Sequence, residues 1–269
     1  MIESVFAPYL HRWQLSVDGE AFTSLSGSLL PVRQGELSAM LKVSDAAEEQ
    51  AGSSLMAWWQ GEGAAPVLAL EGEALLMLRA QGVESLVDMA VNGRDLEATE
   101  ILCEVVTRLH QPRGRPLPAL VPLNLWFQAL WEAAQRHGGL FVDCAATAHA
   151  LLAGPREQVA LHGDIHHANV LDFADKGWLA IDPKGLYGER GFDYANLFCN
   201  PEARLALAPE VFARRLEVVL RVSGIERRRM LQWVLAWAGL SAAWMLEDEQ
   251  SPEVRLGVAQ LAMAALQHG

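Results

Sequence analysis

The sequence predicts an α+β protein with two parts, a small antiparallel sheet with one helix followed by a larger, mostly helical region. Three observations support this prediction. β-like segments separated by turn residues dominate the first 80 residues. Helical spacing of apolar residues dominates after Gly82. A polar, histidine-rich loop interrupts the helical part. We therefore expect a boundary between residues 1–80 and residues 81–269.

The N-terminal part contains short apolar runs separated by the turn signals "DGE" and "RQGE". The runs expected to form strands are residues 12–17, 21–33, 36–43, 66–72 and 73–80. Between the third and fourth runs, "DAAEEQAGSSLMAWWQ" (45–60) has the apolar spacing of a helix. This order predicts an antiparallel sheet with one helix inserted in it.

The C-terminal part contains longer segments with helical periodicity. In residues 95–110 an apolar stripe recurs every three to four positions, formed by Ala98, Ile101, Leu102, Val105 and Leu109. Further helices are expected at 120–136, 141–153, 209–222, 226–247 and 253–267. Residues 158–183 break this pattern and read as short strands joined by a polar loop and a "DKG" turn. Function tends to reside in such loops.

Composition limits the classes of protein to consider. Hydrophobic residues make up 51% and charged residues 20% of the 269, which indicates a globular chain with a well-buried core. The start lacks the pattern of a signal peptide, and the most apolar stretch, 230–246, is shorter than the ~20 residues of a membrane span. We interpret that stretch as a buried helix. Only three widely spaced cysteines occur, which favours a reducing cytoplasm.

The formal charge of −12 argues against a nucleic-acid partner, whose phosphates require Lys and Arg. A cationic partner suits this charge better. Acidity also serves solubility alone, so the charge by itself leaves both interpretations open.

The loop "LHGDIHHANVL" (161–171) concentrates histidines and a carboxylate, which suggests two hypotheses. A zinc site would use His162, Asp164, His166 and His167, but the other histidines form no second ligand motif. A kinase loop of the form H-x-D-x-x-x-x-N would use only His162, Asp164 and Asn169. There the Asp accepts a hydroxyl proton and the Asn binds a metal. We favour the kinase hypothesis.

Two further features complete the kinase pattern. "NVLDF", the "ADKG" turn and "WLAID" predict a hairpin that brings Asn169 and Asp182 together, and such oxygen ligands suit Mg²⁺. Upstream, "AMLKV" places Lys42 on a strand directly before a helix, where Lys42 could bind nucleotide phosphates. Glu48 and Glu49 on that helix can both pair with Lys42, and we prefer Glu49.

With these motifs in place, the chain resembles the aminoglycoside phosphotransferases, small-molecule kinases of the protein-kinase-like fold. Within them it resembles the streptomycin 6-kinase and aminoglycoside/hydroxyurea kinase branch. The resemblance covers residues 26–247. It is carried by "LPVRQGELSAMLKV", "AWWQGEGAAPVLA", "LHGDIHHANVLDFADKGWLAIDPKGLYGERGFDYANLFCNP" and "AWAGLSAAW".

The resemblance implies a bilobal kinase with residues 1–80 as the nucleotide-binding lobe. Asp164 would be the catalytic aspartate, with Mg²⁺ held by Asn169 and Asp182. Lys42, paired with Glu49, would contact the phosphates of ATP or GTP.

It also implies that the Leu78 carbonyl and the Ala80 amide meet adenine, and that Asp193 braces the catalytic loop. His162 is expected to order that loop through hydrogen bonds.

The chain departs from protein kinases at two places. Asp182 is followed by Pro183 and Lys184 instead of Phe and Gly, so no aromatic switch is expected. The corresponding loop contains only Gly27, so a flexible glycine-rich phosphate loop is not expected, and hydrogen bonds from Ser26 and Ser28 are an alternative that we do not favour.

For the acceptor, the resemblance implies streptomycin or another aminoglycoside, with hydroxyurea, another metabolite alcohol or a non-catalytic nucleotide-binding regulator as alternatives. The acidic residues considered for cation contacts are Glu189, Glu202, Glu247 and Asp248. We interpret the tryptophans, including Trp126, Trp233, Trp237 and Trp244, as core residues, and favour packing roles for His166 and His167. The oligomeric state is left open.

Overall fold

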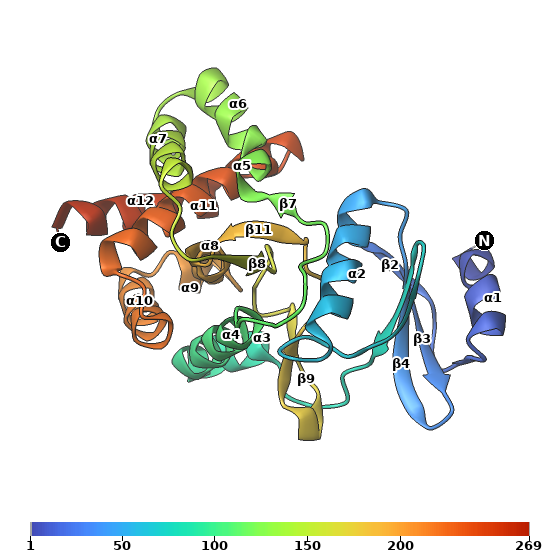
Figure 1. Ribbon diagram of the computed structural model, residues 1–269. Helices are drawn as coiled ribbons and strands as arrows, with labels where there is room; N and C mark the ends of the chain where they lie inside the picture. Colours follow the sequence, from blue (N-terminus) through green and yellow to red (C-terminus); the bar gives the residue numbers. More distant parts are fainter. Residues whose placement is uncertain (1, 269) are drawn as a thin grey trace.

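The structure is a computed structural model that describes residues 2–268, with side chains from Val5 onward. A sheet flanked by two helices lies beside a larger helical part (Figure 1). The sheet order is β1-β3-β4-β6-β5, with β2 also paired to β3, and its pairs are antiparallel. The strands are β1 (Ser16–Val17), β2 (Phe22–Ser24), β3 (Gly27–Gln34), β4 (Leu37–Val43), β5 (Val67–Glu71) and β6 (Ala74–Leu78).

The two faces of this sheet follow from the alternation of side chains along a strand. On β4, Ala39 and Leu41 are fully buried in a cluster with Phe6 of the N-terminal helix. Met40 and Lys42 point to the opposite face, where they line a cavity. The strand period therefore places Lys42 on the inner side of the sheet.

The N-terminal helix α1 (Ile2–Arg12) overturns part of the sequence prediction. Residues 12–17 were expected to form a strand, but the helix continues through Arg12, and only Ser16–Val17 pair with β3. Phe6 is fully buried against the sheet, with Tyr9 and Leu10 packed beside it. Burial of this apolar stripe stabilises the helix over the outer face.

Helix α2 (Ala47–Trp59) confirms the helix expected at 45–60 and packs tightly on the segment after Asp182. At Gly52, a β-carbon would lie 1.9 Å from the Pro183 carbonyl oxygen. Gly185 also lies close to α2, because a β-carbon there would be 2.8 Å from the Ala51 carbonyl carbon. The two glycines allow the helix and this segment to be in direct backbone contact.

The C-terminal part consists mainly of helices. They are α3 (Leu86–Met89), η1 (Ala90–Arg94), α4 (Asp95–Leu109), α5 (Leu123–Trp126), α6 (Gln128–His137), α7 (Leu140–Ala153), α8 (Gly191–Ala195), η3 (Asn196–Cys199), α9 (Ala203–Ala206), α10 (Pro209–Ser223), α11 (Arg227–Glu247) and α12 (Glu253–His268). The helices expected at 141–153, 209–222, 226–247 and 253–267 are all present, as is the one at 95–110.

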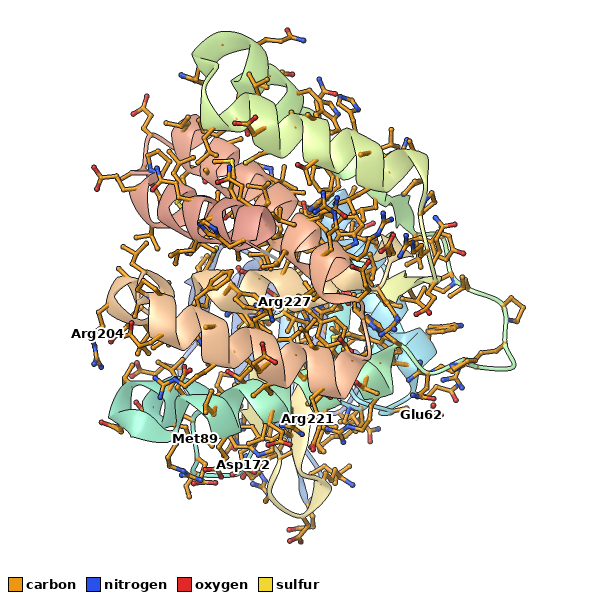
Figure 2. All side chains as sticks on the ribbon, turned by 90° about the vertical axis from the view of Figure 1, so that its left-hand side faces the viewer. Glu62, Met89, Asp172, Arg204, Arg221 and Arg227 are labelled. Carbon is orange, nitrogen blue, oxygen red and sulfur yellow. The ribbon has the colours of Figure 1, made fainter. Side chains whose placement is uncertain are left out.

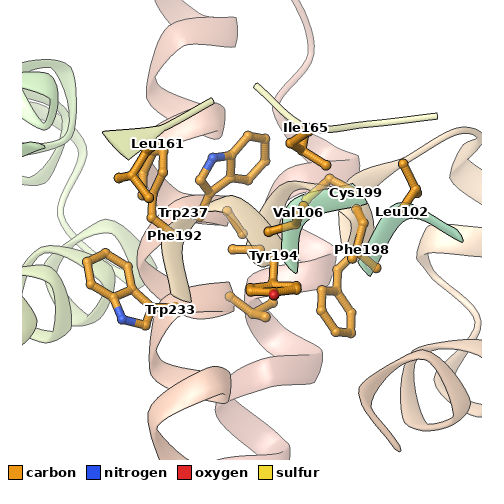
Figure 3. Close-up of a cluster of buried hydrophobic side chains, with 14 of the residues drawn as sticks. Leu102, Val106, Leu161, Ile165, Phe192, Tyr194, Phe198, Cys199, Trp233 and Trp237 are labelled. Carbon is orange, nitrogen blue, oxygen red and sulfur yellow. The ribbon is translucent and has the colours of Figure 1, made fainter. Parts of the chain in front are cut away.

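Helix α11 forms the centre of this part. It packs against α6, α7, α8 and α12, and its residues from Met230 to Ala243 are nearly all buried. Figure 3 shows Trp233 and Trp237 of α11 beside Phe192 and Tyr194 of α8. The apolar stretch at 230–246 is thus the core helix that was predicted. Across residues 2–268, no helix combines the length and apolar character of a membrane span.

The prediction of a single helix at 120–136 is wrong. Val121–Pro122 forms a short strand, β7, and the following helical segments α5 and α6 are separated at Phe127. Pro122 cannot donate a helical hydrogen bond, and Val121 pairs with Leu186 of β11 (Leu186–Glu189). Phe127 is fully buried, so its packing determines where the chain turns.

Helices α4 and α10 lie side by side, and arginines connect them. Arg221, labelled at the surface in Figure 2, pairs with Glu100 at 2.9 Å. The buried Arg215 pairs with Asp95 and donates to the Leu197 carbonyl at 2.8 Å. These bonds fix the segment that follows α8.

The break in helical pattern at 158–183 is confirmed. It contains β8 (Gln158–Leu161), β9 (Val170–Asp172), the turn η2 (Ala174–Lys176) and β10 (Trp178–Ala180). Strands β9 and β10 form an antiparallel hairpin, while β8 pairs with β11. The loop between β8 and β9 carries the H-x-D-x-x-x-x-N motif between the sheet and the helical core.

Candidate active site

The catalytic-loop motif is ordered by His162. Its Nε2 donates to the Ile181 carbonyl at 2.8 Å, so Nδ1 is free to accept the Asp164 amide at 3.2 Å. Burial disfavours the charged imidazole and lowers the pKa of His162, which fits this neutral tautomer. The ring thus connects the loop to the strand that leads to Asp182.

Asp193 holds the same loop from the first turn of α8. Its carboxylate accepts the His162 amide at 2.9 Å and the Gly163 amide at 2.8 Å. His110 Nε2 lies 2.8 Å from the same carboxylate. Gly163 has a φ of +88°, a left-handed conformation that glycine adopts at little cost. The loop therefore has one bent backbone geometry, fixed by a buried carboxylate.

Two amides orient the Asp164 carboxylate. Asn169 Nδ2 lies 3.2 Å from Oδ2 and also donates to the Asp164 main-chain carbonyl at 2.9 Å. Asn196 Nδ2 donates to Oδ1 at 2.8 Å. Each carboxylate oxygen thus accepts one amide and retains capacity for another donor, such as a substrate hydroxyl.

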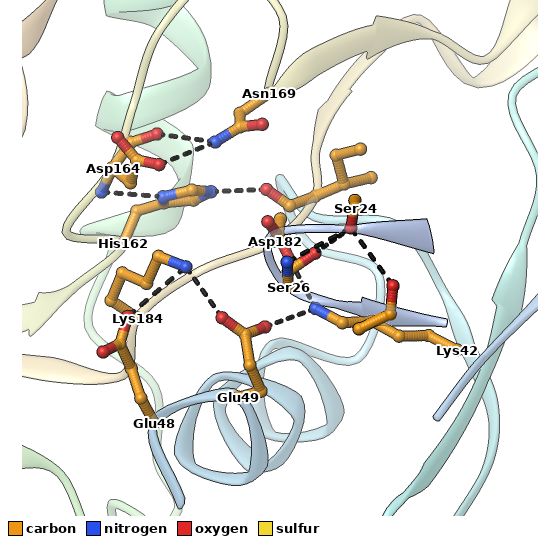
Figure 4. Close-up of polar contacts among 12 residues, drawn as sticks. Ser24, Ser26, Lys42, Glu48, Glu49, His162, Asp164, Asn169, Asp182 and Lys184 are labelled. Carbon is orange, nitrogen blue, oxygen red and sulfur yellow. Dashed lines mark hydrogen bonds and ion pairs between the residues drawn. The ribbon is translucent and has the colours of Figure 1, made fainter. Parts of the chain in front are cut away.

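Lys42, Glu49, Asp182 and Lys184 form a ladder of alternating charge (Figure 4). Lys42 Nζ pairs with both Glu49 Oε2 and Asp182 Oδ1. The other oxygen of Glu49 accepts Lys184 Nζ at 2.8 Å. The structure therefore pairs Lys42 with Glu49, and Glu48 instead lies 3.3 Å from Lys184.

Asn169 and Asp182 suit a magnesium ion by their chemistry. The β9–β10 hairpin joins them, since the Ile181 amide donates to the Asn169 carbonyl at 2.9 Å. Because Asn169 uses its Nδ2 toward Asp164, its side-chain oxygen remains for a cation. Burial raises the pKa of Asp182, but the adjacent Lys42 outweighs this and lowers it, so the carboxylate is charged. One amide oxygen and one carboxylate are ligands that Mg²⁺ prefers.

A cavity of about 380 Å³ lies under the sheet, next to Lys42. Met40, Met77 and Leu171 give it apolar walls, and Leu78 and Ala80 lie at its edge. The Leu78 amide donates to the Pro66 carbonyl at 2.8 Å, but Pro66 has no N–H with which to return the bond. This leaves the Leu78 carbonyl for a ligand, and a flat, apolar nucleotide base suits the cavity.

A larger cavity of about 780 Å³ lies between the sheet and the helical part and contains Asp164 in its wall. The two cavities share the residues Ser24, Ser26, Asn169 and Asp182. They therefore meet where the expected metal ligands lie. A donor in one cavity and an acceptor in the other would react at this junction.

Of the four acidic residues considered for substrate contacts, only Asp248 lines the larger cavity. Glu189 is buried elsewhere, where it pairs with Arg229 and accepts Trp233 Nε1 at 2.8 Å. Glu202 is exposed and pairs with Arg204, and exposed Glu247 is outside the cavity wall. Glu48, instead, belongs to that wall.

The interpretation of the tryptophans as core holds for Trp233, which is fully buried. It also holds for Trp237, which is 4% exposed although it borders the larger cavity, and it is wrong for Trp126 and Trp244, which are only partly buried and line that cavity. Trp126 and Trp244 meet edge to face, with ring centroids 5.9 Å apart. The helical stripe is therefore buried at one end and forms an aromatic wall at the other.

The side chains of the three loop histidines point to different places and do not surround a common metal position. His162 faces Ile181, and His167 is buried, with a pKa that burial and the nearby Arg215 lower to about 3. His166 lines the larger cavity, contrary to the packing role favoured for it, with Nε2 3.7 Å from Asp164 Oδ2. In the described part of the chain, no group of three His, Cys, Asp or Glu side chains is arranged to hold a metal.

Sequence reasoning missed Lys184, Asn196 and Ser24. Lys184 was noticed only as a departure from the kinase pattern, although its position two residues after Asp182 places it beside the same helix. Asn196 follows Asp193 by one helical turn, a spacing that could have indicated a shared face toward the loop. Ser24 gave no signal, because only the strand pairing brings it to the cavity.

Comparison with known proteins agrees with this geometry. Residues 12–249 match the family model described as aminoglycoside/hydroxyurea antibiotic resistance kinase. The chain is 51% identical to a streptomycin 3''-kinase from Klebsiella pneumoniae over 89% of this chain and 91% of that one. It is 31% identical to a hydroxyurea phosphotransferase from Kitasatospora aureofaciens, over 95% and 77% respectively.

The fold also matches solved structures of small-molecule kinases. Aminoglycoside phosphotransferase APH(4)-Ia, solved with ADP and hygromycin B, gives a TM-score of 0.65 at 13% identity, covering 97% of this chain and 98% of that one. At this identity the likeness concerns the fold alone. Together with the family match, it establishes the predicted bilobal architecture. The chain belongs to the aminoglycoside/hydroxyurea antibiotic resistance kinases, phosphotransferases built on the protein-kinase-like fold.

Proposed function

We propose that this kinase transfers the γ-phosphoryl group of ATP to a hydroxyl of streptomycin, at the 3'' position. The 51% identity to a streptomycin 3''-kinase supports that position, whereas the sequence resemblance alone had pointed to the 6-kinase branch. The three buried thiols, Cys103, Cys144 and Cys199, support a reducing cytoplasm as its location, where ATP is available.

One observation carries the proposal. The nucleotide-sized cavity and the larger cavity meet at Asn169 and Asp182, with Asp164 in the wall of the larger one. This arrangement allows in-line transfer between two bound molecules.

The size and charge of the larger cavity favour a bulky cation. A volume of about 780 Å³ suits a drug-sized ligand and greatly exceeds the needs of hydroxyurea. Four carboxylates line it against two cations, in a chain with a formal charge of −12; they are Glu48, Asp164, Asp182 and Asp248 against Lys184 and Arg255. These charges attract the guanidinium groups of streptomycin.

The chain's own residues carry the steps of the reaction. Asp164, held by Asn169 and Asn196, orients the acceptor hydroxyl and receives its proton. Lys42, held by Glu49, neutralises charge on the nucleotide phosphates. Mg²⁺ held by Asn169 and Asp182 would supply further neutralisation of phosphate charge. The Leu78 carbonyl and the Ala80 amide position the adenine, and GTP would use the same phosphate contacts.

The direct test is ATP consumption by the purified protein with streptomycin, kanamycin or hydroxyurea, followed by mass and NMR location of the phosphate. We expect phosphorylation of streptomycin at the 3'' hydroxyl. Phosphorylation at the 6 position would show that streptomycin is the substrate but that the proposed 3'' position is wrong. No turnover of streptomycin would refute the proposed substrate.

A matched substitution tests the assigned base. Asp164→Asn keeps the size of the side chain and should reduce kcat by at least ~10²-fold, while ATP still binds. Calorimetry with Mg-ATP separates binding from transfer. Full activity of this variant would contradict the role of Asp164.

A further inference from the structure

A directed chain of side-chain amides connects the acceptor cavity with Asp164. Asn196 Nδ2 donates to Asp164 Oδ1 at 2.8 Å, and Asn200 Nδ2 donates to Asn196 Oδ1, also at 2.8 Å. Asn200 Nδ2 additionally donates to the Asn196 main-chain carbonyl at 3.1 Å. Both residues line the cavity, but Asn196 is only 3% exposed, whereas Asn200 is half-buried. The chain thus begins at the cavity wall and ends at the catalytic carboxylate.

The direction of these bonds follows from Asp164. An ionised carboxylate only accepts, so Asn196 must present Nδ2 to Asp164 and Oδ1 to Asn200. Asn200 must therefore present Nδ2 to Asn196. Its own Oδ1 accepts no hydrogen bond from residues 2–268, and this oxygen is what Asn200 retains for a ligand in the cavity.

The backbone under this chain is rigid. Arg215, which is 1% exposed, donates to the Asn200 carbonyl at 2.6 Å and to the Leu197 carbonyl at 2.8 Å. Arg215 is itself fixed by Asp95 on α4. Because the backbone is held, the orientation of the two side-chain amides is determined by Asp164 at one end and by the ligand in the cavity at the other.

We propose that Asn200 recognises a hydrogen-bond donor of the acceptor, a hydroxyl or guanidinium N–H near the phosphorylated hydroxyl. Asn196 is then a positioning residue that passes this orientation to Asp164. The inference rests on the proposed function, because it requires an acceptor that carries such donors. An acceptor without a donor at this place leaves the Asn200 oxygen without a partner and is bound more weakly.

Two substitutions at Asn200 distinguish the role of its side-chain oxygen, which faces the cavity, from the role of its N–H groups, which orient Asn196. Asn200→Asp keeps an oxygen toward the cavity but loses the N–H groups that orient Asn196, whereas Asn200→Ala loses both. We expect both variants to lower kcat with streptomycin by a similar factor, roughly tenfold. Only Asn200→Ala should also raise the KM for streptomycin, again roughly tenfold. The exposed Asn92→Asp, with the same change of charge, should alter neither constant.

A third variant removes Asn196, the middle residue of the hydrogen-bonded amides. Asn196→Ala should lower kcat and leave the KM for streptomycin unchanged, because Asn196, although it borders the cavity, is only 3% exposed and directs its side-chain Nδ2 and Oδ1 to Asp164 and Asn200. This result tests the positioning role even if an Asn200 variant is unstable. Equal KM values in the two Asn200 variants, or an unchanged kcat in all three variants, would overturn the inference.

A separate readout distinguishes this inference from the proposed function. If the wild-type protein does not phosphorylate streptomycin, the proposed function fails. Release of phosphate from Mg-ATP, with water as acceptor, then decides the inference. A lower rate in the Asn200→Asp and Asn196→Ala variants supports the amide chain, and an unchanged rate overturns it.

Discussion

Lys184 donates a 2.8 Å hydrogen bond to Glu49, the carboxylate whose other oxygen pairs with Lys42. Burial opposes the charged form of Lys184, but its bond to Glu49 and the negative charge of that residue outweigh burial and raise its pKa. Glu49 is therefore held by two cations. When Lys42 contacts phosphate, Lys184 can still hold Glu49 in place.

We expect Lys184→Met to reduce kcat/KM for ATP by roughly tenfold or more, because a hydrogen bond to a charged group contributes about 1.5–3 kcal/mol. Initial rates over a range of ATP concentrations measure this. Lys176→Met, in the exposed η2 turn, removes the same charge away from the site and serves as control. Equal kinetics of the two variants would contradict a role for Lys184.

Asn169 is expected to control the requirement for magnesium. Replacing it by Ala removes one oxygen ligand, so the Mg²⁺ concentration for half-maximal activity should rise by roughly tenfold or more, and EDTA should abolish activity in both proteins. Rates measured against free Mg²⁺ at saturating ATP provide the test. A variant with the magnesium dependence of the wild type would show that Asn169 does not bind the metal.

Trp244 should contribute to acceptor binding but not to nucleotide binding. Trp244→Ala removes one side of the aromatic wall, and a loss of about 1–2 kcal/mol would raise the KM for streptomycin several-fold to about thirtyfold. The KM for ATP should stay the same. Trp58→Ala is the matched control, because Trp58 packs against Arg113 and Arg115 outside this cavity. If Trp244→Ala raised the KM for ATP and left the KM for streptomycin unchanged, the aromatic wall would have no role in acceptor binding.

The buried, neutral His162 predicts that stability falls in mild acid. Burial lowers its pKa in the folded protein, whereas in the unfolded chain it titrates near 6.5. Below about pH 6.5 the unfolded state binds the extra proton, so unfolding becomes more favourable by up to ~1.4 kcal/mol per pH unit.

His162→Gln keeps a donor toward Ile181 but cannot titrate, so its stability should depend less on pH between 7 and 5. Urea unfolding of both proteins at several pH values measures the difference. Parallel pH dependence in the two proteins would assign the acid sensitivity to other groups.

The contact between α2 and the Pro183 carbonyl predicts the effect of Gly52→Ala. In an exposed helix Ala would stabilise by about 1 kcal/mol, but here its β-carbon would lie 1.9 Å from a carbonyl oxygen. We expect a net loss of roughly 1–3 kcal/mol and weaker ATP binding, because α2 carries Glu49. Thermal unfolding is the measurement, with Gly154→Ala, whose nearest atom is 4.0 Å away, as control. A stabilised Gly52→Ala would contradict the close packing.

Sequence alone determined the groups whose spacing reports local geometry. The loop from His162 to Asn169 and the hairpin to Asp182 are continuous in the chain, so their relative positions follow from short-range rules. The strand position of Lys42, followed by a helix with Glu49, was predictable for the same reason.

Only the tertiary structure decided which distant side chains meet. Glu189 looked available for a cation but is buried with Arg229, while Trp244 looked like core but lines the larger cavity. A periodic pattern identifies the two faces of a helix but not what covers each face along its length. The link from Asn200 through Asn196 to Asp164 likewise depends on how η3, which follows α8, packs against the catalytic loop. Local sequence thus determined the chemical groups of the candidate site, and packing between distant elements decided which of them face the larger cavity.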